Sequence, residues 1–523
     1  MISETPASNG FRRARIAGPI AFAALTALGM LANRPFDYNF MSYSFGDIGA
    51  SWHAIDLIRA GKMPGIDYVF QYGALSLGIF QTLLAALGES PVGIYRFGII
   101  SVVLMSIFMY IFARRIGAPA VAWAVGACWV MSTQRTNFLS SAHAIEPVLL
   151  AAAVLSGTSG RLTLALSLSV VTWFVKPSMA LIMATSFSVW ILMDSRDLRS
   201  LARNGMKVVQ TVMSSGLISF GISVAWLGWA SASTLLLPSQ GSNVYKSLNF
   251  GFFRGQGSQI WYMPGASAGY YLGTQSASWL TINVLLLSLS AVISVHWLRN
   301  WSRDRAYRDR LGELIVMLVA AHTTFVCFFF GMAWGWTYYA WMFWMAMMAG
   351  MTWLSQHCDR PKAVAGLAAT LAGLSLLGNF ADVDRSLKVL PRYVAVEPRY
   401  GLYGPPDLAE AMVRLRADVG DKPTLIGLMF GYGAGVLREP FYAPPLWAMT
   451  PGDEFEPMLK AWRDTIDRAE LIVVGVEESM LAKFPEVDRT IRTQFEPKEY
   501  GVQPPLNLTL FRRVRPPVEP ERK

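Results

Sequence analysis

The feature that most constrains this chain is a series of apolar runs, several of them long enough to cross a lipid bilayer. A helix needs about 20 mostly apolar residues to cross a hydrocarbon core about 30 Å thick. Hydrophobic residues make up 53% of the 523-residue chain and charged residues only 15%, whereas soluble domains carry about 25% charged residues. The composition therefore predicts a mainly α-helical, polytopic membrane bundle. We count eleven runs, at residues 15–32, 94–113, 118–133, 145–157, 161–175, 177–193, 207–229, 277–296, 313–332, 335–354 and 362–379.

The basic residues predict how this bundle is oriented. Arg12, Arg13 and Arg15 precede the first run, and Lys and Arg gather in cytoplasmic loops. The N-terminus is therefore predicted to be cytoplasmic, with the first run as an uncleaved span and the long loops 33–93 and 230–276 outside. The net charge of +10 then reflects membrane topology and gives no reason to expect a nucleic-acid partner. The other positions that this topology places in the cytoplasm are Arg114, Arg115, Arg161, the loop 194–207, the loop 298–312, Arg360 and Lys362.

The apolar stretch at 74–88 differs from the longer apolar runs in its length. It has fewer residues than a span requires. If it crossed the bilayer, the basic loops after it would fall on the outer side, against the usual bias of Lys and Arg. We therefore expect this stretch to lie at the membrane interface.

The last part of the chain, residues 381–523, is predicted to be a small extracytoplasmic α/β domain that follows the membrane domain at 1–380. Charged residues and prolines become common here. Amphipathic and apolar segments alternate in it, as in mixed α/β domains. No glycine-rich phosphate loop or metal-ligand spacing occurs, so we expect a scaffold or a lid. The segments are the helices 407–417 and 454–468 and the strands 424–429, 470–475 and 507–514.

The stretch 43–73, which lies after the first run, holds three aspartates, at positions 47, 56 and 67. Ionisable groups are costly beside a bilayer and commonly mark a functional site there. Asp47 is the strongest candidate, either as a general base that removes a hydroxyl proton or as a ligand for a divalent cation such as Mg²⁺ or Mn²⁺. The structural alternative is that Asp47 caps the helix expected at 48–60. Asp67 is a second-rank candidate, with the alternative that it ends a turn at PGID.

His143 and Glu146 form a second candidate group. They are three residues apart and would share one face of a helix. We interpret them as a second polar wall facing Asp47, or alternatively as a glutamate that stabilises the start of a helix. The spacing is too loose to predict a metal site.

Lys176 lies between two apolar runs at the predicted outer surface. A lysine ammonium binds phosphate as a point charge, and a lipid phosphate would lie at this depth. The alternative is a lysine whose long side chain reaches the interface. Arg135 and Arg254, in the outer loops, are candidates for further phosphate contacts.

The first outer loop resembles that of a known enzyme family. The chain reads GDIG at 46–49, AGK at 60–62, PGIDY at 64–68 and YGAL at 72–75. This pattern is similar to that of the polytopic glycosyltransferases of the GT-C fold, which include the protein O-mannosyltransferases, the lipid A aminoarabinose transferases and their family 39- or 83-like homologues. The resemblance implies that Asp47 matches the catalytic acidic residue of that loop, although Ile48 replaces the usual second acid.

The resemblance also implies a reaction. Lys176 with Pro177 resembles the family's lysine near the lipid phosphate. The enzyme would move a sugar, with inversion, from a polyprenyl-phosphate donor to a glycan, lipid or protein acceptor at the outer face of the inner membrane. Asp47 would act as the base, and Lys176, with Arg135 or Arg254, would stabilise the departing phosphate.

Two other classes of protein remain open from the sequence. A transporter or flippase of a lipid-linked substrate would carry ionisable residues near mid-membrane, whereas here they cluster at one face. A non-catalytic polytopic assembly protein would need no pocket that combines acidic and basic groups.

Overall fold

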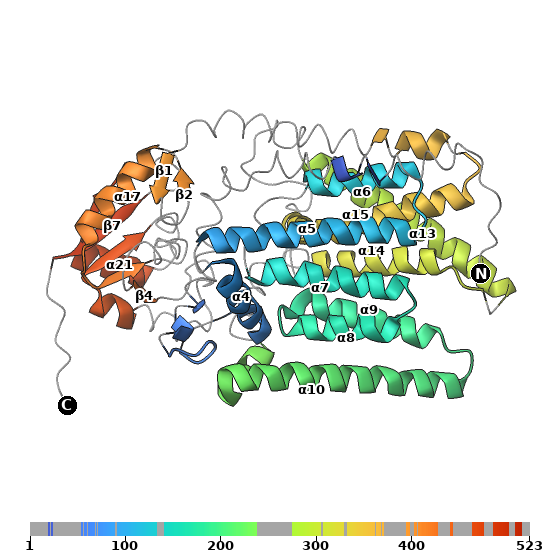
Figure 1. Cartoon of the computed structure of the whole chain (residues 1–523), viewed down its shortest axis with the longest axis horizontal. Helices are drawn as coiled ribbons and strands as arrows, with labels where there is room; N and C mark the ends of the chain where they lie inside the picture. Colours follow the sequence, from blue (N-terminus) through green and yellow to red (C-terminus); the bar gives the residue numbers. More distant parts are fainter. Residues whose placement is uncertain are drawn as a thin grey trace.

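The computed structural model is mainly helical, with a small sheet near the C-terminus (Figure 1). Apart from gaps of one or two residues, it describes residues 19–24, 54–67, 70–88, 91–132, 141–237, 275–328, 332–370, 394–397, 402–404, 406–426, 440–442, 463–474, 485–501 and 508–514. The helices of the first part are α4 (Ala74–Leu87), α5 (Pro91–Arg115), α6 (Ala120–Ser132), α7 (Ser141–Thr158), α8 (Leu162–Trp173), α9 (Pro177–Met193), α10 (Leu198–Leu236), α13 (Gln275–Arg303), α14 (Arg310–Phe328) and α15 (Met332–His357).

Nine of the eleven predicted runs coincide with α5 to α10 and α13 to α15. The runs 15–32 and 362–379 lie largely outside the described residues. Among the described helices, α5, within Arg96–Arg115, and α10 combine the length and the hydropathy needed to cross a bilayer. The apolar helix α8 has 12 residues, or about 18 Å at 1.5 Å per residue. The eleven-span bundle therefore stays a prediction.

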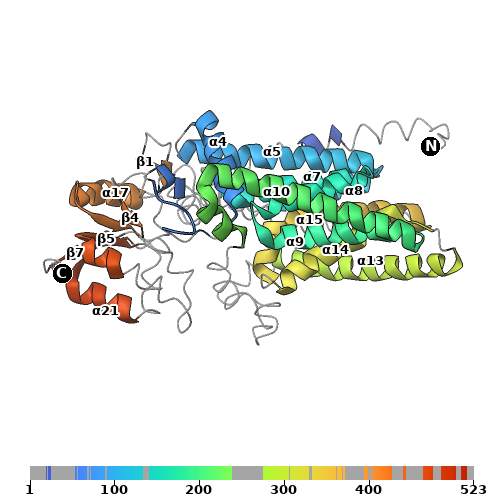
Figure 2. The same cartoon turned by 90° about the horizontal axis from the view of Figure 1, so that it is seen from below.

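The long helices pack side by side and alternate in direction (Figures 1 and 2). Helix α8 packs on α7 and α9, α15 packs on α14 and α6, and α5 packs on α7. Large side chains fill the spaces between them, since these interiors approach crystal-like packing density. The largest fully buried side chains of this core are Phe112, Phe187, Phe325, Trp341 and Trp344.

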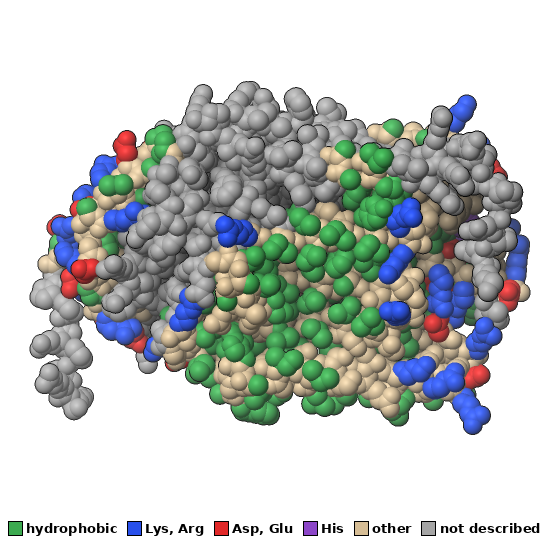
Figure 3. Space-filling model, viewed as in Figure 1, with side chains coloured by type: hydrophobic (Ala, Val, Ile, Leu, Met, Phe, Trp, Pro, Cys, Tyr) green, Lys and Arg blue, Asp and Glu red, His purple; other side chains and the backbone are tan. Residues whose placement is uncertain are grey.

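The basic loops lie together at one end of the bundle. Arg115 at the end of α5 donates hydrogen bonds to the Leu155 carbonyl and to Ser159 at the end of α7. Arg310 Nη2 lies 2.7 Å from Asp194 Oδ1, which ties the start of α14 to the end of α9. Figure 3 shows Lys and Arg gathered at the right-hand end and hydrophobic side chains along the helices. The cytoplasmic orientation of this end stays a prediction.

Helix α10 has an unusual distribution of side chains. Its buried face carries serines at every fourth or eighth position, including Ser215, Ser219 and Ser223. Its exposed face carries large apolar side chains, with Ile218 65% and Trp229 68% exposed. A helix on the surface of a soluble protein has the opposite arrangement.

Helix α4 is short and differs in direction. Its 14 residues span about 21 Å. Figure 1 shows it steeply inclined to the long helices, near the end of the bundle where the sheet lies. The location of 74–88 at the membrane interface stays a prediction.

The C-terminal part contains a five-stranded mixed sheet in the order β4-β3-β5-β7-β6. Strand β3 pairs parallel with β4 and β5, and β7 pairs antiparallel with β5 and β6. Its elements are α17 (Pro406–Val419), β3 (Thr424–Ile426), β4 (Pro440–Tyr442), β5 (Leu471–Val474), α21 (Pro485–Gln494), β6 (Phe495–Glu499) and β7 (Thr509–Arg513), beside a hairpin of β1 (Val394–Glu397) and β2 (Leu402–Gly404).

The predicted α/β character of this part is confirmed. Helix 407–417 and strands 424–429, 470–475 and 507–514 correspond to α17, β3, β5 and β7. The segments α21 and β6 were not predicted, because α21 buries only Val487 and Ile491 and β6 only Phe495. A second core cluster joins buried residues of α4 and α7 to those of α17, β5 and β7.

Asp418, at the end of α17, provides a test of this domain's stability. Hydrogen bonds from Lys498 and then from Tyr500 hold the pKa of the Asp418 carboxyl below its usual value. A depressed folded-state pKa stabilises the fold above the unfolded-state pKa, about 3.9, and this contribution is lost as pH falls through the folded-state pKa. Asp418→Asn should lower the free energy of unfolding by about 0.2–1 kcal/mol at pH 7.

The cost of Asp418→Asn should shrink towards zero in acid, when the wild-type carboxyl is protonated too. The measurement is unfolding of the full-length protein at pH 7 and at acid pH. The matched control is Asp421→Asn, since Asp421 is exposed three residues away. An equal cost at both pH values would contradict the assigned role of Asp418.

Candidate functional site

Four polar side chains from three segments meet at the end of the bundle opposite the basic loops. We call Tyr72, His143, Glu146 and Lys176 the Lys176 cluster. Lys176 Nζ lies 3.3 Å from Glu146 Oε2 and 3.2 Å from His143 Nδ1. His143 Nε2 lies 3.0 Å from Tyr72 Oη. The structure therefore brings together three of the predicted site residues, His143, Glu146 and Lys176.

The Lys176 cluster is buried. Lys176 is 4% exposed and Glu146 1% exposed. Removing an ion from water costs several kcal/mol, and the cost is offset only when an opposite charge and hydrogen bonds are in place. The ammonium can only donate, so His143 Nδ1 accepts from it and Nε2 donates to the Tyr72 oxygen. The ammonium and the carboxylate of this pair balance each other's charge.

Glu146 and His143 are held on one face of α7 by their spacing of three residues. The helix begins at Ser141, so Glu146 lies in its second turn. The alternative that Glu146 stabilises the helix start is therefore wrong, because the dipole acts mainly within the first turn. Pro147 lies inside α7 and lacks an N–H to donate to the His143 carbonyl.

Lys176 is positioned by a break between two helices. Helix α8 ends at Trp173, Lys176 is the extended residue that precedes α9, and Pro177 is the first residue of α9, a position where its fixed φ suits the helix. The side chain turns inward to Glu146. The alternative that Lys176 extends to the interface is therefore wrong.

The first loop is joined to this break through the main chain. Gly73 N donates to Val175 O at 3.0 Å, and Leu75 N donates to Phe174 O at 2.9 Å. A Cβ at Gly73 would lie 2.1 Å from the Phe174 oxygen, so only glycine permits this approach. The joint brings Tyr72 to His143. The sequence did not identify Tyr72 as a site residue, since it was noted only as part of the YGAL motif. The glycine that follows it was the one sign in the sequence of a close contact at this position.

The other predicted site residues do not join the Lys176 cluster. Asp67 accepts a hydrogen bond from Met63 N at 2.7 Å, and its own N–H donates to the Met63 carbonyl. It therefore closes the PGID turn, as its structural alternative proposed. Asp47, Arg135 and Arg254 lie outside the described residues.

The Lys176 cluster does not suit a divalent cation. In the described part of the chain it offers a single carboxylate, and an ammonium already lies 3.3 Å from that carboxylate. Mg²⁺ and Mn²⁺ prefer several oxygen ligands. A metal bound by Asp47 stays a prediction.

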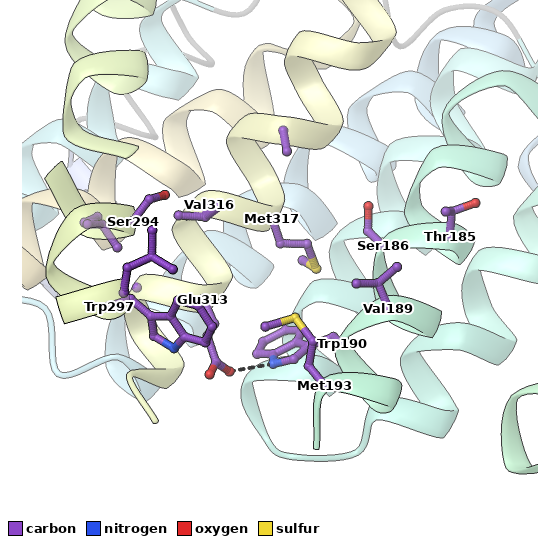
Figure 4. Close-up of a pocket in the computed structure, with 14 residues that line it drawn as sticks. Thr185, Ser186, Val189, Trp190, Met193, Ser294, Trp297, Glu313, Val316 and Met317 are labelled. Carbon is purple, nitrogen blue, oxygen red and sulfur yellow. Dashed lines mark hydrogen bonds between the residues drawn. The ribbon is translucent and has the colours of Figure 1, made fainter. Parts of the chain in front are cut away.

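A separate hollow lies between α9, α13 and α14, nearer the basic end (Figure 4). Its volume is about 440 Å³, and most of its lining is apolar. Trp190 Nε1 donates to Glu313 Oε2 across it at 2.9 Å. No residue of the Lys176 cluster lines this hollow, so the two features are distinct.

The buried pair can be tested by a double-mutant cycle. Lys176→Met should lower the free energy of unfolding by about 3–5 kcal/mol, because it removes the positive charge that lies 3.3 Å from the buried Glu146 carboxylate. The double variant Lys176→Met/Glu146→Gln should recover much of this loss. Thermal or denaturant unfolding of the purified protein gives the measurement. A loss of unfolding free energy in the double variant that equals the sum of the losses in the two single variants would contradict the pairing.

The main-chain joint can be tested at Gly73. Gly73→Ala should lower the free energy of unfolding by about 1–3 kcal/mol or more, since the added Cβ meets a backbone oxygen that cannot move cheaply. The control is Gly216→Ala in α10, where the nearest atom to a new Cβ lies 4.0 Å away. If Gly73→Ala and Gly216→Ala changed the free energy of unfolding equally, the close approach of Gly73 to the Phe174 oxygen would be contradicted.

Comparisons with known proteins do not extend this picture. No protein-family model matches the chain, and no curated protein matches it. The likeness to the GT-C glycosyltransferases therefore depends on the residues that carry it, namely the GDIG and YGAL segments of the first loop and Lys176 with Pro177.

Proposed function

We propose that this protein is a membrane glycosyltransferase that moves a sugar from a polyprenyl-phosphate donor to an extracytoplasmic acceptor. The observation that carries the proposal is the joint between the first loop and the Lys176 break. Gly73 and Leu75 belong to YGAL, one of the two segments that resemble the GT-C family. Their main-chain N–H groups donate to Val175 and Phe174, which directly precede the other segment, Lys176-Pro177. The acidic segment of the same loop begins 26 residues before Gly73, at Asp47.

Helix α10 supports the membrane location. Large apolar side chains exposed along one face are unfavourable in water and cost little in lipid, and small residues on the buried face allow close helix contact there. Two of the buried serines donate to carbonyls: Ser223 Oγ to the Ser219 carbonyl of the same helix at 2.9 Å, and Ser231 Oγ to the Pro64 carbonyl at 2.6 Å. The grouped basic ends support a cytoplasmic side at the end away from the Lys176 cluster.

The proposed reaction is an inverting displacement. Asp47 removes the proton from the acceptor hydroxyl, and the hydroxyl oxygen attacks the anomeric carbon. The bond from that carbon to the phosphate oxygen breaks, and the lipid phosphate leaves with the electron pair. Groups that stabilise charge on the leaving phosphate lower the barrier of this step.

Lys176 alone cannot balance that charge. Its ammonium is paired with Glu146, and a phosphate beside it would also approach the Glu146 carboxylate. The proposal therefore assigns Arg135 and Arg254 as additional cations that act together with Lys176. Glu146 and His143 are positioning residues, because they fix the Lys176 ammonium.

The position of the Lys176 cluster favours an enzyme over a transporter. Tyr72 precedes α4, His143 is the third residue of α7, and Lys176 immediately precedes α9. These are helix ends, whereas the relay of a proton-coupled transporter lies near the middle of its helices. An end position suits a reaction with a phosphate at the lipid–water boundary.

The proposal is tested with the full-length protein in membranes, a panel of labelled polyprenyl-phosphate sugars and envelope acceptors. Asp47→Asn should lower sugar transfer by about 10²–10⁴-fold, as expected for loss of a general base. Asp67→Asn is the matched control, since Asp67 closes a turn, and should retain transfer. Full activity of Asp47→Asn would remove Asp47 from the mechanism. A lack of transfer by the wild type with every donor would contradict the proposed activity.

A further inference from the structure

We infer that His296, Asp309 and His357 form a binding site for a divalent transition metal, with zinc as the preferred ion. One ligand atom from each residue can be chosen so that all three lie within 4.8 Å of one another. His296 lies near the end of α13, Asp309 immediately precedes α14, and His357 is the last residue of α15. The site is at the basic end of the bundle, away from the Lys176 cluster.

The ligand types select the class of metal. Two imidazoles and one carboxylate suit zinc and its neighbours in the first transition series, whereas Mg²⁺ and Ca²⁺ prefer an all-oxygen site. Three protein ligands leave one position of a tetrahedron to water. His357 is exposed, so an ion and its water can reach this position from solvent.

Surrounding groups orient two of the ligands as in known metal sites. His357 Nδ1 lies 3.0 Å from the Trp353 carbonyl, which can only accept, so Nδ1 carries the proton and Nε2 has its lone pair. The His357 ring also stacks on Trp353, with ring centroids 4.3 Å apart. Trp353 Nε1 donates to Asp309 Oδ2 at 2.7 Å.

Asp309 also caps the start of α14, since Gly312 N donates to its Oδ1 at 2.9 Å. A carboxylate has about four lone-pair positions, so these two hydrogen bonds leave capacity for a cation. The nearby Arg308 and Arg310 contact Glu313, and Arg310 also contacts Asp194. These acidic partners reduce the repulsion between the arginines and a bound cation.

His296 is the ligand that must give up contacts. Its Nε2 lies 2.9 Å from Asn300 Nδ2 and 3.2 Å from Tyr307 Oη. A metal on this nitrogen would displace both, so we expect moderate affinity. Its ring centroid is 5.3 Å from that of His357, with an angle of 73° between the planes. A bound metal would link the connection between α13 and α14 to the end of α15. This inference does not depend on the proposed transferase activity.

The test uses the full-length protein, purified in detergent, treated with EDTA and titrated with Zn²⁺. The wild type should bind one equivalent, and Co²⁺ should give the visible absorption of a tetrahedral nitrogen and oxygen site. His357→Gln should weaken Zn²⁺ binding at least tenfold, because it removes one of three ligands. His53→Gln, which removes a histidine elsewhere in the chain, should bind as the wild type does.

Thermal unfolding gives a second readout. Zn²⁺ should raise the Tm of the wild type and of His53→Gln, and leave that of His357→Gln unchanged. Because His357 is exposed at a helix end, the variant should fold. Equal Zn²⁺ affinity in His357→Gln and the wild type would overturn the site. The absence of stoichiometric Zn²⁺ binding by the wild type, or equal displacement by Mg²⁺, would also overturn it.

Discussion

The buried ion pair of Lys176 and Glu146 is the constraint on which the end of the helix bundle depends. Each charge offsets part of the cost of taking the other out of water. The pair joins the start of α9 to α7, and His143 links the same ammonium to Tyr72 of the first loop. Three segments that are distant in the sequence are thereby held at one place.

The two ends of the bundle use charge in different ways. At the end with the short loops, exposed or half-buried arginines contact helix carbonyls and acids, as Arg310 does with Asp194, and ion pairs open to solvent each stabilise the fold only slightly. At the other end, the charges of Lys176 and Glu146 are buried, and their pairing offsets the cost of removing them from water. This difference places the groups best able to do chemistry at the end nearer the mixed sheet.

The sequence predicted the helices well and the site in part. The run 177–193 corresponds to α9 because Lys176-Pro177 marks its start and Asp194 ends it. His143, Glu146 and Lys176 were named from their chemistry. Their contacts could not be predicted, because they depend on the packing of α7 against α8 and α9. A Lys176 side chain that extends to the membrane interface was a reasonable alternative for an isolated helix. This alternative is wrong because Glu146 offers the ammonium a buried partner.

Two of the elements that were missed, α21 and β6, have little apolar signal of their own. Strand β6 reads FEPKE and buries only Phe495, since it is an edge strand held by pairing with β7. Tyr72 lacked a signal as a site residue because a tyrosine in an aromatic run is usually packing. Only the glycine beside it, whose role depends on the distant Phe174 carbonyl, distinguishes it.

The joint at Gly73 has a consequence for how this molecule can change over time. Its hydrogen bonds connect peptide groups, which every residue except proline can supply in full. Side chains on both sides can therefore be exchanged while the geometry of the joint is kept, provided that position 73 stays glycine. A scaffold of this kind permits the side chains around it to diverge while the attachment point is unchanged.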